Sequence, residues 1–381
     1  MMSVMYLTRR RTFITLGALG GTAAAVRLGA SPGQDGGALL PSTATPVRAV
    51  EVPLEEHLRH GVSARSAGAA GAGRVTGVLD VGRFRQVALT WAGELRGGLM
   101  VRTGSDLGWT DWQELALTEH RDANEGNGRL GTDLLWVDDA DRVQVRVRGS
   151  APQALQLVAI DPGWQPSDEP DDIELMRLSR APRPPLFTRR DWSADESWRN
   201  GSPTYDNNIK QVHVHHTASS NRYRYHDVPA MIRGFYRYHT GSLGWSDIGY
   251  NFLVDKWGRA WIGRYGGARR AVRGAHTLGF NTDSCGIAAI GNFNARYPTV
   301  GMVTKIVRLS AWKLDMYGHD PKEWIRVTSG GSDRYPKGMR VILPRIDGHR
   351  HTNHTSCPGD YLFGRLPAIR KRASRRARYY S

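Results

Sequence analysis

Side chains of metal-ligand type stand in two short stretches that lie far apart in the chain. The upstream stretch is a hydrophobic run that ends in two imidazoles, His215 and His216. The downstream stretch places His349 eight residues before Cys357, which runs directly into Pro358-Gly359. Histidine and cysteine are zinc ligands, and a site with three protein ligands leaves the fourth position for water. We therefore predict that His215, His349 and Cys357 hold one zinc ion in a site of catalytic type.

Neighbouring histidines leave alternatives to two of these ligands. In a strand, His213 and His215 point to one face and His216 to the other, because side chains alternate. His216 is thus the alternative to His215, and His351 or His354 is the alternative to His349. A lone buried histidine would more often be structural. The pairing of His215 with the distant histidine and cysteine favours a ligand.

The elements around these stretches predict an α/β fold, with a mixed β-sheet flanked by helices. Apolar residues at offsets of three and four predict a helix over 228–239, and short apolar runs predict strands. The further elements that we expect are a strand at 211–215, a hairpin of 248–254 and 260–263, a central strand at 286–290, a helix at 303–316 and a helix after 358–360.

At these residues the chain resembles the zinc-dependent N-acetylmuramoyl-L-alanine amidases, a family that includes the peptidoglycan recognition proteins and the phage-type amidases. The resemblance covers roughly residues 186–368. Each motif alone is weak, but six in the family order are specific. The matching motifs are Arg190-Asp191-Trp192, Val214-His215-His216-Thr217-Ala218, Asp247-Ile248-Gly249-Tyr250-Asn251-Phe252, Gly274-Ala275-His276, Gly286 to Phe293, and Gly348-His349-Arg350 through Cys357-Pro358-Gly359.

The resemblance implies roles for further residues. Tyr250 matches a tyrosine beside the metal that would donate a hydrogen bond to a developing oxyanion. Thr355 stands where phage-type enzymes carry lysine and recognition proteins carry threonine, and it would support the same oxygen. His276 and Trp245 would line the substrate groove. The alternative for Tyr250, His276 and Trp245 is a packing role.

The activity implied by the resemblance is hydrolysis of the amide between the lactyl group of N-acetylmuramic acid and L-alanine of the peptidoglycan stem. One alternative is a peptidoglycan-binding recognition protein without activity, but such members lack the ligand cysteine. Another is a zinc-free hydrolase with Cys357 as nucleophile. The Cys-Pro-Gly sequence after a histidine-rich loop fits that reading less well.

The N-terminal residues predict export. Residues 1–30 combine the basic segment Thr8-Arg9-Arg10-Arg11-Thr12-Phe13 with an apolar segment that is too short for a transmembrane helix. We interpret them as a twin-arginine-type signal peptide of a secreted, extracellular or cell-wall protein, and the alternative is an ordinary secretory signal with an extra arginine. Residues 31–73 are expected to be a Gly/Ala/Pro-rich linker, within which 47–58 could pack as a first strand.

Between this linker and the metal-ligand stretches we expect a second domain. Residues 74–163 hold short β-type runs and predict a small all-β sandwich. Its Trp109, Trp112 and Trp136 suit either sugar stacking or the core, and we favour the core. The segment resembles the β-rich domain often placed before actinobacterial amidases of this family. An acidic Pro-rich linker is expected at 164–185.

Charge and cysteine content limit the partners. The chain of 381 residues has a formal net charge of +16, which favours anionic surfaces. Residues 369–381 are basic without an acidic residue, so we expect a solvated tail that could tether the protein to anionic wall polymers. No nucleic-acid-binding motif is present. With only two cysteines, the chain has no disulfide framework, and we expect Cys285 to be a buried small residue.

Overall fold

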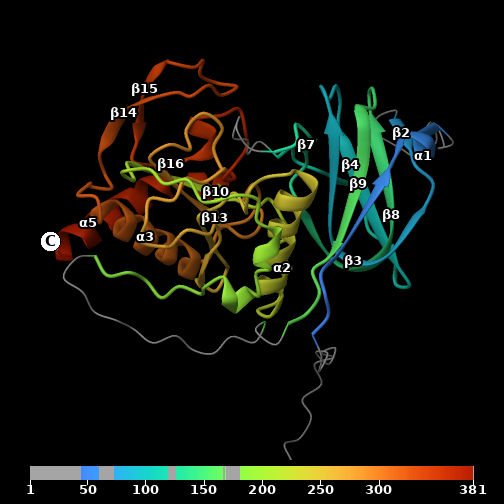
Figure 1. The fold of residues 1–381 in the computed structure, drawn as a ribbon, viewed down its shortest axis with the longest axis horizontal. Coiled ribbons are helices and arrows are strands. Elements are labelled where there is room, and N and C mark those ends of the chain that lie inside the picture. The colour runs from blue at the N-terminus through green and yellow to red at the C-terminus, as the bar shows by residue number, and fades with distance from the viewer. Residues whose placement is uncertain (1–43, 60–72, 119–125, 166–167, 169–180, 381) are drawn as a thin grey trace, which may run out of the picture. The chain divides into compact units, whose positions relative to one another are not determined.

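The computed structural model describes residues 44–59, 73–118, 126–165, 168 and 181–380 (Figure 1). The signal peptide predicted at 1–30 lies outside the described residues, as does most of the expected acidic linker. Within the described part of the chain, no helix has both the length and the apolar character needed to cross a membrane.

The first domain is an all-antiparallel β structure, as the sequence predicts. Its strands follow the order β1-β9-β3-β8-β4-β5. In addition, β2 pairs with β8, β7 pairs with β3 and β6 pairs with β4. The elements are β1 (Arg48–Pro53), α1 (Glu55–Arg59), β2 (Gly73–Val75), β3 (Leu79–Ala92), β4 (Leu99–Ser105), β5 (Gly108–Trp109), β6 (Gln113–Glu114), β7 (Leu130–Gly131), β8 (Leu135–Arg148) and β9 (Gln153–Asp161).

The start of this domain corrects one predicted boundary. β1 pairs with β9 over its whole length, from Arg48 opposite Asp161 to Pro53 opposite Gln156. Residues 48–53 therefore belong to the β domain, within the segment 47–58 that could pack as a first strand inside the linker expected at 31–73.

The tryptophans of the β domain take different places. Trp136 is buried, whereas Trp109 is partly exposed. The guanidinium of Arg102 lies 5.0 Å from the ring centres of both Trp109 and Trp112, and Arg146 lies 4.2 Å from that of Trp112. Trp136 belongs to a buried cluster that includes residues 228–236 of the second domain and not to the core of the β structure itself, so the expected place in the sandwich core is wrong for Trp136.

The second domain has a five-stranded mixed sheet in the order β12-β11-β13-β10-β16, in agreement with the predicted fold class. β11, β13, β10 and β16 are parallel, and β12 is antiparallel to β11. The strands are β10 (Gln211–His216), β11 (Phe252–Val254), β12 (Ala260–Ile262), β13 (Ser284–Ala289) and β16 (Ile346–Gly348). A separate hairpin of β14 (Trp324–Thr328) and β15 (Arg340–Pro344) was not predicted.

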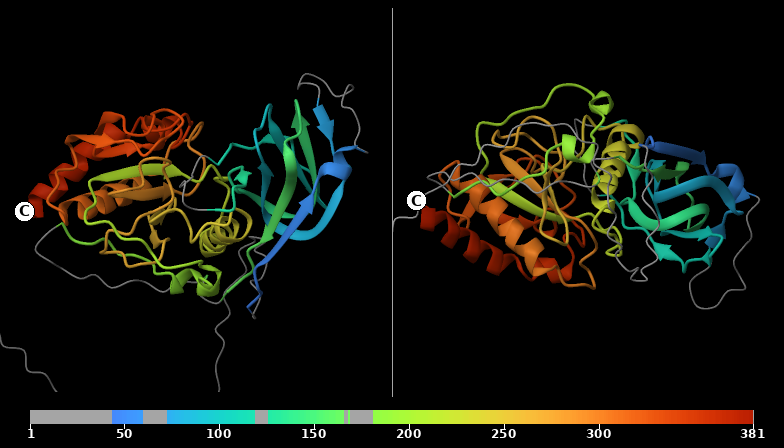
Figure 2. Two further views of the ribbon diagram at one scale, coloured as in Figure 1. Left: turned by 45° about the horizontal axis from the view of Figure 1, so that its top comes forward. Right: turned by 90° about the horizontal axis from the view of Figure 1, so that it is seen from below.

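Helices cover both faces of this sheet, and Figure 2 shows α3 and α5 side by side. Val212 and Val214 of β10 pack with α3 and α5, while Ala288 of β13 packs on the other face with α2. The helical elements are η2 (Arg190–Trp192), η3 (Glu196–Trp198), α2 (Asp227–Arg237), the π-helical η4 (Tyr238–Ser242), α3 (Val300–Asp315), η5 (His349–His351), α4 (Asp360–Phe363) and α5 (Leu366–Tyr380).

The C-terminal residues differ from the expected solvated tail. Residues 366–380 form the helix α5, and its Ile369, Ala373 and Ala377 are buried. These three positions are spaced by four residues, so they form one stripe along the helix. The arginines between them occupy the other faces of α5.

Candidate metal centre

The ligand atoms of His215, His349 and Cys357 all lie within 4.8 Å of one another. All three side chains are buried. His215 Nδ1 and Cys357 Sγ are 3.7 Å apart. Two ligands of a tetrahedral zinc, at about 2.0–2.3 Å from the metal, are separated by roughly 3.3–3.8 Å. The donor set and its spacing therefore fit a zinc ion.

The sheet explains why residues so far apart in sequence meet here. β10 and β16 are parallel neighbours, with His213 beside Asp347 and Val214 beside Gly348. Because these strands run in the same direction, the residues that come next, His215 and His349, lie at the same edge of the sheet. Their ring centres are 4.8 Å apart. Two ligands are thus placed by strand pairing.

The third candidate ligand, Cys357, lies on the loop that follows η5. The backbone N–H of Arg350 donates to the Cys357 carbonyl at 3.0 Å, which closes this loop. The backbone N–H of Cys357 donates to the Thr355 hydroxyl at 2.9 Å. The backbone N–H of His216 points at Cys357 Sγ at 3.3 Å. A donor directed at the sulfur stabilises the thiolate, which is the form that binds a metal.

The second ring nitrogen of His215 faces two polar groups that the sequence did not indicate as its partners. His215 Nε2 lies 3.2 Å from His276 Nδ1 and 3.3 Å from the Thr277 hydroxyl oxygen. The carboxamide oxygen of Asn281 accepts the backbone N–H groups of both His276 and Thr277. Such outer contacts fix the ring orientation of a metal-ligating histidine.

The predicted groove-lining role of His276 is therefore corrected. Its side chain is fully buried and packs against His215, with ring centres 5.1 Å apart. A Cβ added at Gly274 or Gly286 would collide with this imidazole, so the two glycines leave the space that it fills. His276 supports a ligand and presents no surface to a substrate.

Trp245 also does not take the groove-lining place predicted for it. It is buried and stacks on His239, with ring centres 4.4 Å apart. His239 Nδ1 in turn accepts the backbone N–H of Gly249, the residue before Tyr250. Trp245 thus packs behind the segment that carries Tyr250, and it does not form an open groove wall.

Tyr250 lies beside the three ligands. Its ring centre is 5.8 Å from that of His215, and its side chain is buried. Burial raises the pKa of the Tyr250 phenol well above its ordinary value, and the negative charges of Asp133 and Cys357 raise it further. The phenol therefore keeps its proton at neutral pH.

The alternative histidine ligands do not join the cluster. His216 Nδ1 accepts the backbone N–H of Phe293 at 3.3 Å, on the opposite face of β10. His351 lies over Phe363, with ring centres 4.8 Å apart, and His354 is exposed. His215 and His349 are the histidines that the fold brings to Cys357.

A buried pair links the two strands that carry the histidine ligands. His213 Nδ1 lies 2.6 Å from Asp347 Oδ1, and His213 Nε2 lies 3.1 Å from the Phe280 carbonyl oxygen. Both ring nitrogens therefore face acceptors. Asp347 is two residues before His349 and His213 is two residues before His215, so the pair fixes β10 and β16 at the point where they deliver the ligands.

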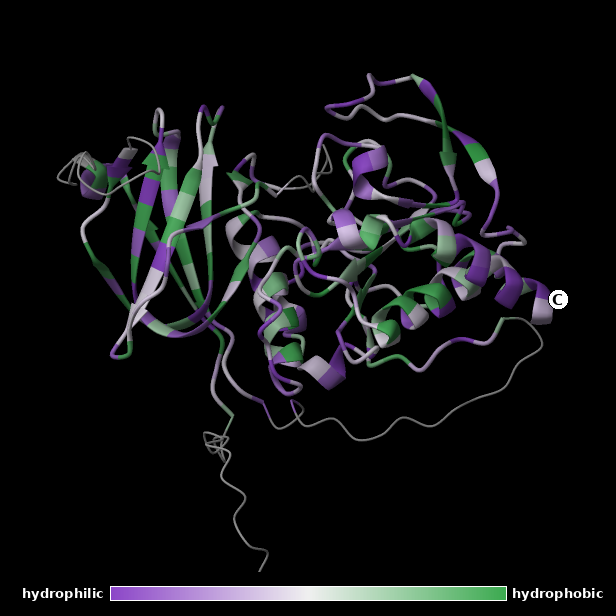
Figure 3. Cartoon of the chain, turned by 180° about the vertical axis from the view of Figure 1, so that it is seen from behind, coloured by the Kyte–Doolittle hydropathy of each residue, from purple (hydrophilic) through white to green (hydrophobic). Residues whose placement is uncertain are grey.

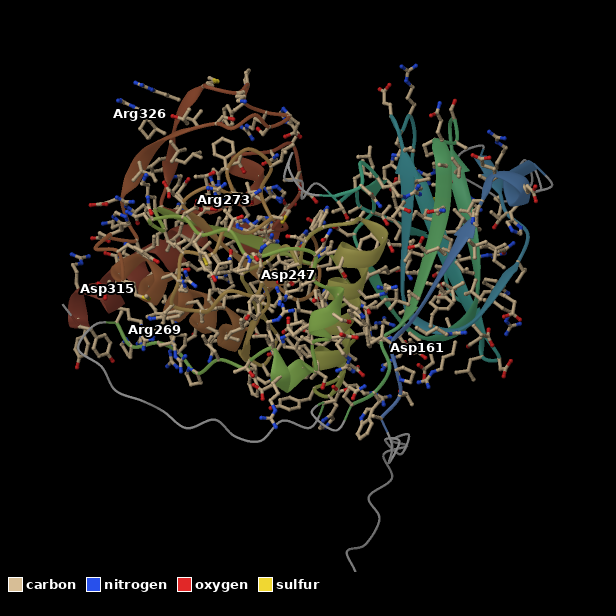
Figure 4. The ribbon with its side chains drawn as sticks, viewed as in Figure 1. Asp161, Asp247, Arg269, Arg273, Asp315 and Arg326 are labelled. Atoms are coloured by element: carbon tan, nitrogen blue, oxygen red, sulfur yellow. The ribbon has the colours of Figure 1, made fainter. Side chains whose placement is uncertain are left out.

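Arg189, Trp192, Asp247 and Cys285, which lie farther from the three candidate ligands, make structural contacts. Arg189 Nη1 donates to Asp247 Oδ1 at 3.1 Å in the interior, where Asp247 is labelled in Figure 4. The Trp192 indole N–H donates to the Ile262 carbonyl at 2.8 Å. Cys285 is buried in β13, as expected, and burial raises the pKa of its thiol to about 11. It is therefore a protonated core residue at neutral pH.

Comparison with known proteins agrees with the two-domain organisation. A family model described as "N-acetylmuramoyl-L-alanine amidase" matches residues 205–360, which include the three ligands and Tyr250. A second family model, described as "Rv3811 N-terminal galactose-binding domain-like", matches residues 40–171. This second match also begins well before residue 74.

Individual relatives are similar to the second domain. Peptidoglycan-recognition protein SC2 of Drosophila melanogaster is 29% identical over 160 residues, which are 42% of this chain and 73% of that protein. N-acetylmuramoyl-L-alanine amidase of Homo sapiens is 34% identical over 142 residues, which are 36% of this chain and 20% of that protein. The solved structure "Drosophila PGRP-LB wild-type" has 26% identity and a TM-score of 0.38, and covers 48% of this chain and 92% of that one.

Proposed function

We propose, on the premise that residues 205–360 belong to the N-acetylmuramoyl-L-alanine amidase family that includes the peptidoglycan recognition proteins, that this protein is a zinc-dependent peptidoglycan amidase. The bond cleaved joins the lactyl group of N-acetylmuramic acid to L-alanine of the stem peptide. The observation that carries the proposal is the convergence of His215, His349 and Cys357 on one point.

A zinc ion held by these ligands would supply a Lewis acid for the amide carbonyl and a bound water that ionises near neutral pH. The chain's own groups have separate tasks. Cys357 would bind the ion as a thiolate, and the backbone N–H of His216 points at its sulfur at 3.3 Å. His276 and Thr277 hold the His215 ring in one orientation.

The oxyanion that develops during amide hydrolysis needs a hydrogen-bond donor. Tyr250 is suited to this task, because its raised pKa keeps the proton on the phenol. The Thr355 hydroxyl accepts the Cys357 N–H, and its own hydrogen is not used in that bond. We assign Tyr250 as the main donor and Thr355 as a support for the loop that carries Cys357.

Peptidoglycan lies outside the cytoplasmic membrane, so the proposed substrate requires export. The twin-arginine-type segment of residues 1–30 supports a secreted or wall-associated location. Comparison of the N-terminus of the extracellular protein with that of the full-length chain, by mass spectrometry, tests this part of the proposal. An uncleaved chain confined to the cytoplasm would contradict it.

A digest of purified peptidoglycan tests the activity itself. The wild type and Cys285→Ser, which alters the other cysteine of the chain, are expected to release stem peptides beginning with L-alanine. Cys357→Ser is expected to release none and to lose bound zinc. Chelation is expected to abolish release by the wild type, and added zinc to restore it. Products are identified by mass spectrometry.

Two other results would redirect the proposal. Muropeptides that bind to zinc-loaded protein and remain uncut would indicate a recognition protein without activity. Cleavage that survives chelation but is lost after thiol alkylation would make Cys357 a nucleophile and remove zinc from the reaction.

A further inference from the structure

Four arginines line a groove between α3 and α5, on the surface formed by the C-terminal residues. The groove has a volume of about 450 Å³. We call it the arginine groove, and its lining residues are Thr304, Val307, Arg308, Arg372, Arg375, Arg376, Tyr379 and Tyr380. No carboxylate is among these lining residues. In Figure 3 the end of α5 that is marked C is hydrophilic.

These arginines are not neutralised by the protein. Within residues 181–380, no ion pair joins any of the four to a carboxylate, whereas Arg189, Arg233 and Arg259 of the same domain are each paired. Arg372 donates to the Thr304 hydroxyl at 3.0 Å. The four arginines therefore leave positive charge concentrated along this groove.

Arg376 is the clearest sign that the groove lacks a counterion. Its guanidinium lies 5.1 Å from the ring centre of Tyr380, and its Nε is buried without an acceptor among the described residues. A buried donor without a partner costs roughly 1–3 kcal/mol. Burial lowers the pKa of Arg376 and the positive charge of Arg308 lowers it as well, while the neighbouring Tyr380 partly opposes this shift. An anion in the groove would relieve both costs.

The geometry of the groove indicates the class of anion. Arg372, Arg375 and Arg376 are spaced by three and four residues, so they follow one side of α5, opposite Arg308 of α3. Guanidinium groups bind phosphate oxygens in bidentate fashion. The four positive charges along this open groove exceed the single negative charge of one phosphate diester. They match a polymer that presents several phosphate diesters in succession.

We propose that the arginine groove binds a phosphodiester polymer of the cell wall and so retains the enzyme beside its substrate. The assignment of the polymer to the wall rests on the proposed function. The groove itself is built from α3 and α5, which carry none of the predicted ligands. Binding at the groove and cleavage at the metal centre can therefore be measured separately.

The test measures binding of the full chain to a fluorescent poly(glycerol phosphate) oligomer, in the absence of peptidoglycan. The double variant Arg372→Gln/Arg376→Gln is expected to weaken binding by about tenfold or more, because two charge-assisted contacts to phosphate are lost. The matched control Arg326→Gln/Arg340→Gln removes the same charge from exposed positions on β14 and β15 and is expected to change binding less than about twofold.

Exposed Arg375 provides a second variant if the double variant unfolds. Arg375→Glu reverses a charge at the groove and is expected to weaken binding as well. Equal losses in the groove variants and the control would show that net charge alone attracts the polymer, and would overturn the proposal. So would a preference for phosphatidylglycerol vesicles or for a single-stranded oligonucleotide of equal charge.

Cleavage of peptidoglycan stripped of anionic polymers separates the two proposals. The groove variants are expected to release stem peptides from it at the wild-type rate. If the wild type fails to cleave but binds the oligomer through the groove, the amidase assignment fails and the binding site stands. If the wild type cleaves and does not bind the oligomer, the binding site alone is refuted.

Discussion

The Tyr250 phenol is held in its protonated form by its surroundings. Burial raises its pKa well above the ordinary value near 10.0, and Asp133 and Cys357 raise it further. Ionisation of this group therefore cannot contribute to a pH–rate profile below about pH 10. The phenol therefore keeps the proton that a hydrogen bond to an oxyanion requires.

Tyr250→Phe is accordingly expected to lower kcat by about 10²–10³-fold, because one oxyanion donor is lost. Zinc content and KM are expected to stay near the wild-type values, since the ring and its packing remain. Tyr297→Phe, at an exposed tyrosine, serves as the control. Steady-state kinetics on a soluble muropeptide measure both. Full activity in Tyr250→Phe would assign the oxyanion to another donor.

The contacts behind His215 can be tested with a change that keeps side-chain volume. Thr277→Val removes the hydroxyl that lies 3.3 Å from His215 Nε2. Loss of an outer contact to a metal-ligating histidine lowers metal affinity by about 10–100-fold, and we expect the lower end because His276 Nδ1 remains.

Competition with a chelator of known zinc affinity measures this change. Thr328→Val, at an exposed position of β14, is the control and is expected to leave affinity unchanged. Equal zinc affinities in Thr277→Val and the wild type would show that the threonine does not orient His215.

Among the elements, α5 differs most from the structure that its composition predicted. Six basic residues without an acidic one suggested a solvated tail, yet α5 extends to Tyr380 and packs on α3. Within the predicted tail, the buried residues of α5 are Ile369 and the small residues Ala373, Ser374 and Ala377, and the large buried Leu366 lies just before it. So sparse a stripe carries little hydrophobic signal, and the dense charge hides it.

Ile369→Ala is expected to destabilise the second domain by about 2–5 kcal/mol. The reason is that the Ile369 side chain of α5 is fully buried in the core that α5 shares with α3. Lys371→Ala, two residues away and exposed, is expected to change stability by less than about 0.5 kcal/mol. Denaturant unfolding measures both. Equal stabilities would mean that α5 contributes no packing energy, as in the solvated tail that the sequence suggested.

The strands that deliver the ligands were easier to predict. The run that ends at His215 predicted a strand at 211–215, and β10 spans Gln211–His216. Parallel pairing then brings His349 beside His215. The contact of His276 with His215 was not predictable, because it depends on space that Gly274 and Gly286 leave from separate segments. Spacing in sequence does not record such a contact.

At the scale of the described chain from residue 44 onward, the two domains share packing. Ala88, Trp136, Val158 and Ile160 of the β domain belong to one buried cluster with α2. The Tyr238 hydroxyl donates to the Thr132 carbonyl at 2.8 Å, and Gln86 Nε2 donates to the Met231 carbonyl at 3.2 Å. Asp133, which raises the pKa of Tyr250, also comes from the β domain. The first domain therefore contributes to the surroundings of the metal centre.

A buried ion pair at this contact provides the sharpest test. Arg233 of α2 binds both oxygens of Asp168, at 2.6 and 2.8 Å, and both side chains are buried. Arg233 also donates to the carbonyls of Pro162 and Gly163, at the end of the β domain. Asp168 stands in the segment that its acidic composition marked as a linker. The Asp168 carboxylate instead pairs with the buried guanidinium of Arg233, which stays protonated in proteins.

Asp168→Ala is therefore expected to cost about 3–5 kcal/mol, because it leaves the Arg233 charge buried without a partner. Asp138→Ala, at an exposed aspartate of β8, is expected to cost far less. Because the two domains share a core, calorimetry should show one unfolding transition for the wild type, and Asp168→Ala should shift that whole transition. Two transitions in the wild type, with the transition of the second domain unmoved by Asp168→Ala, would instead show that the domains fold independently. The effect of Asp133 on the pKa of Tyr250 would then require that the two domains be in contact.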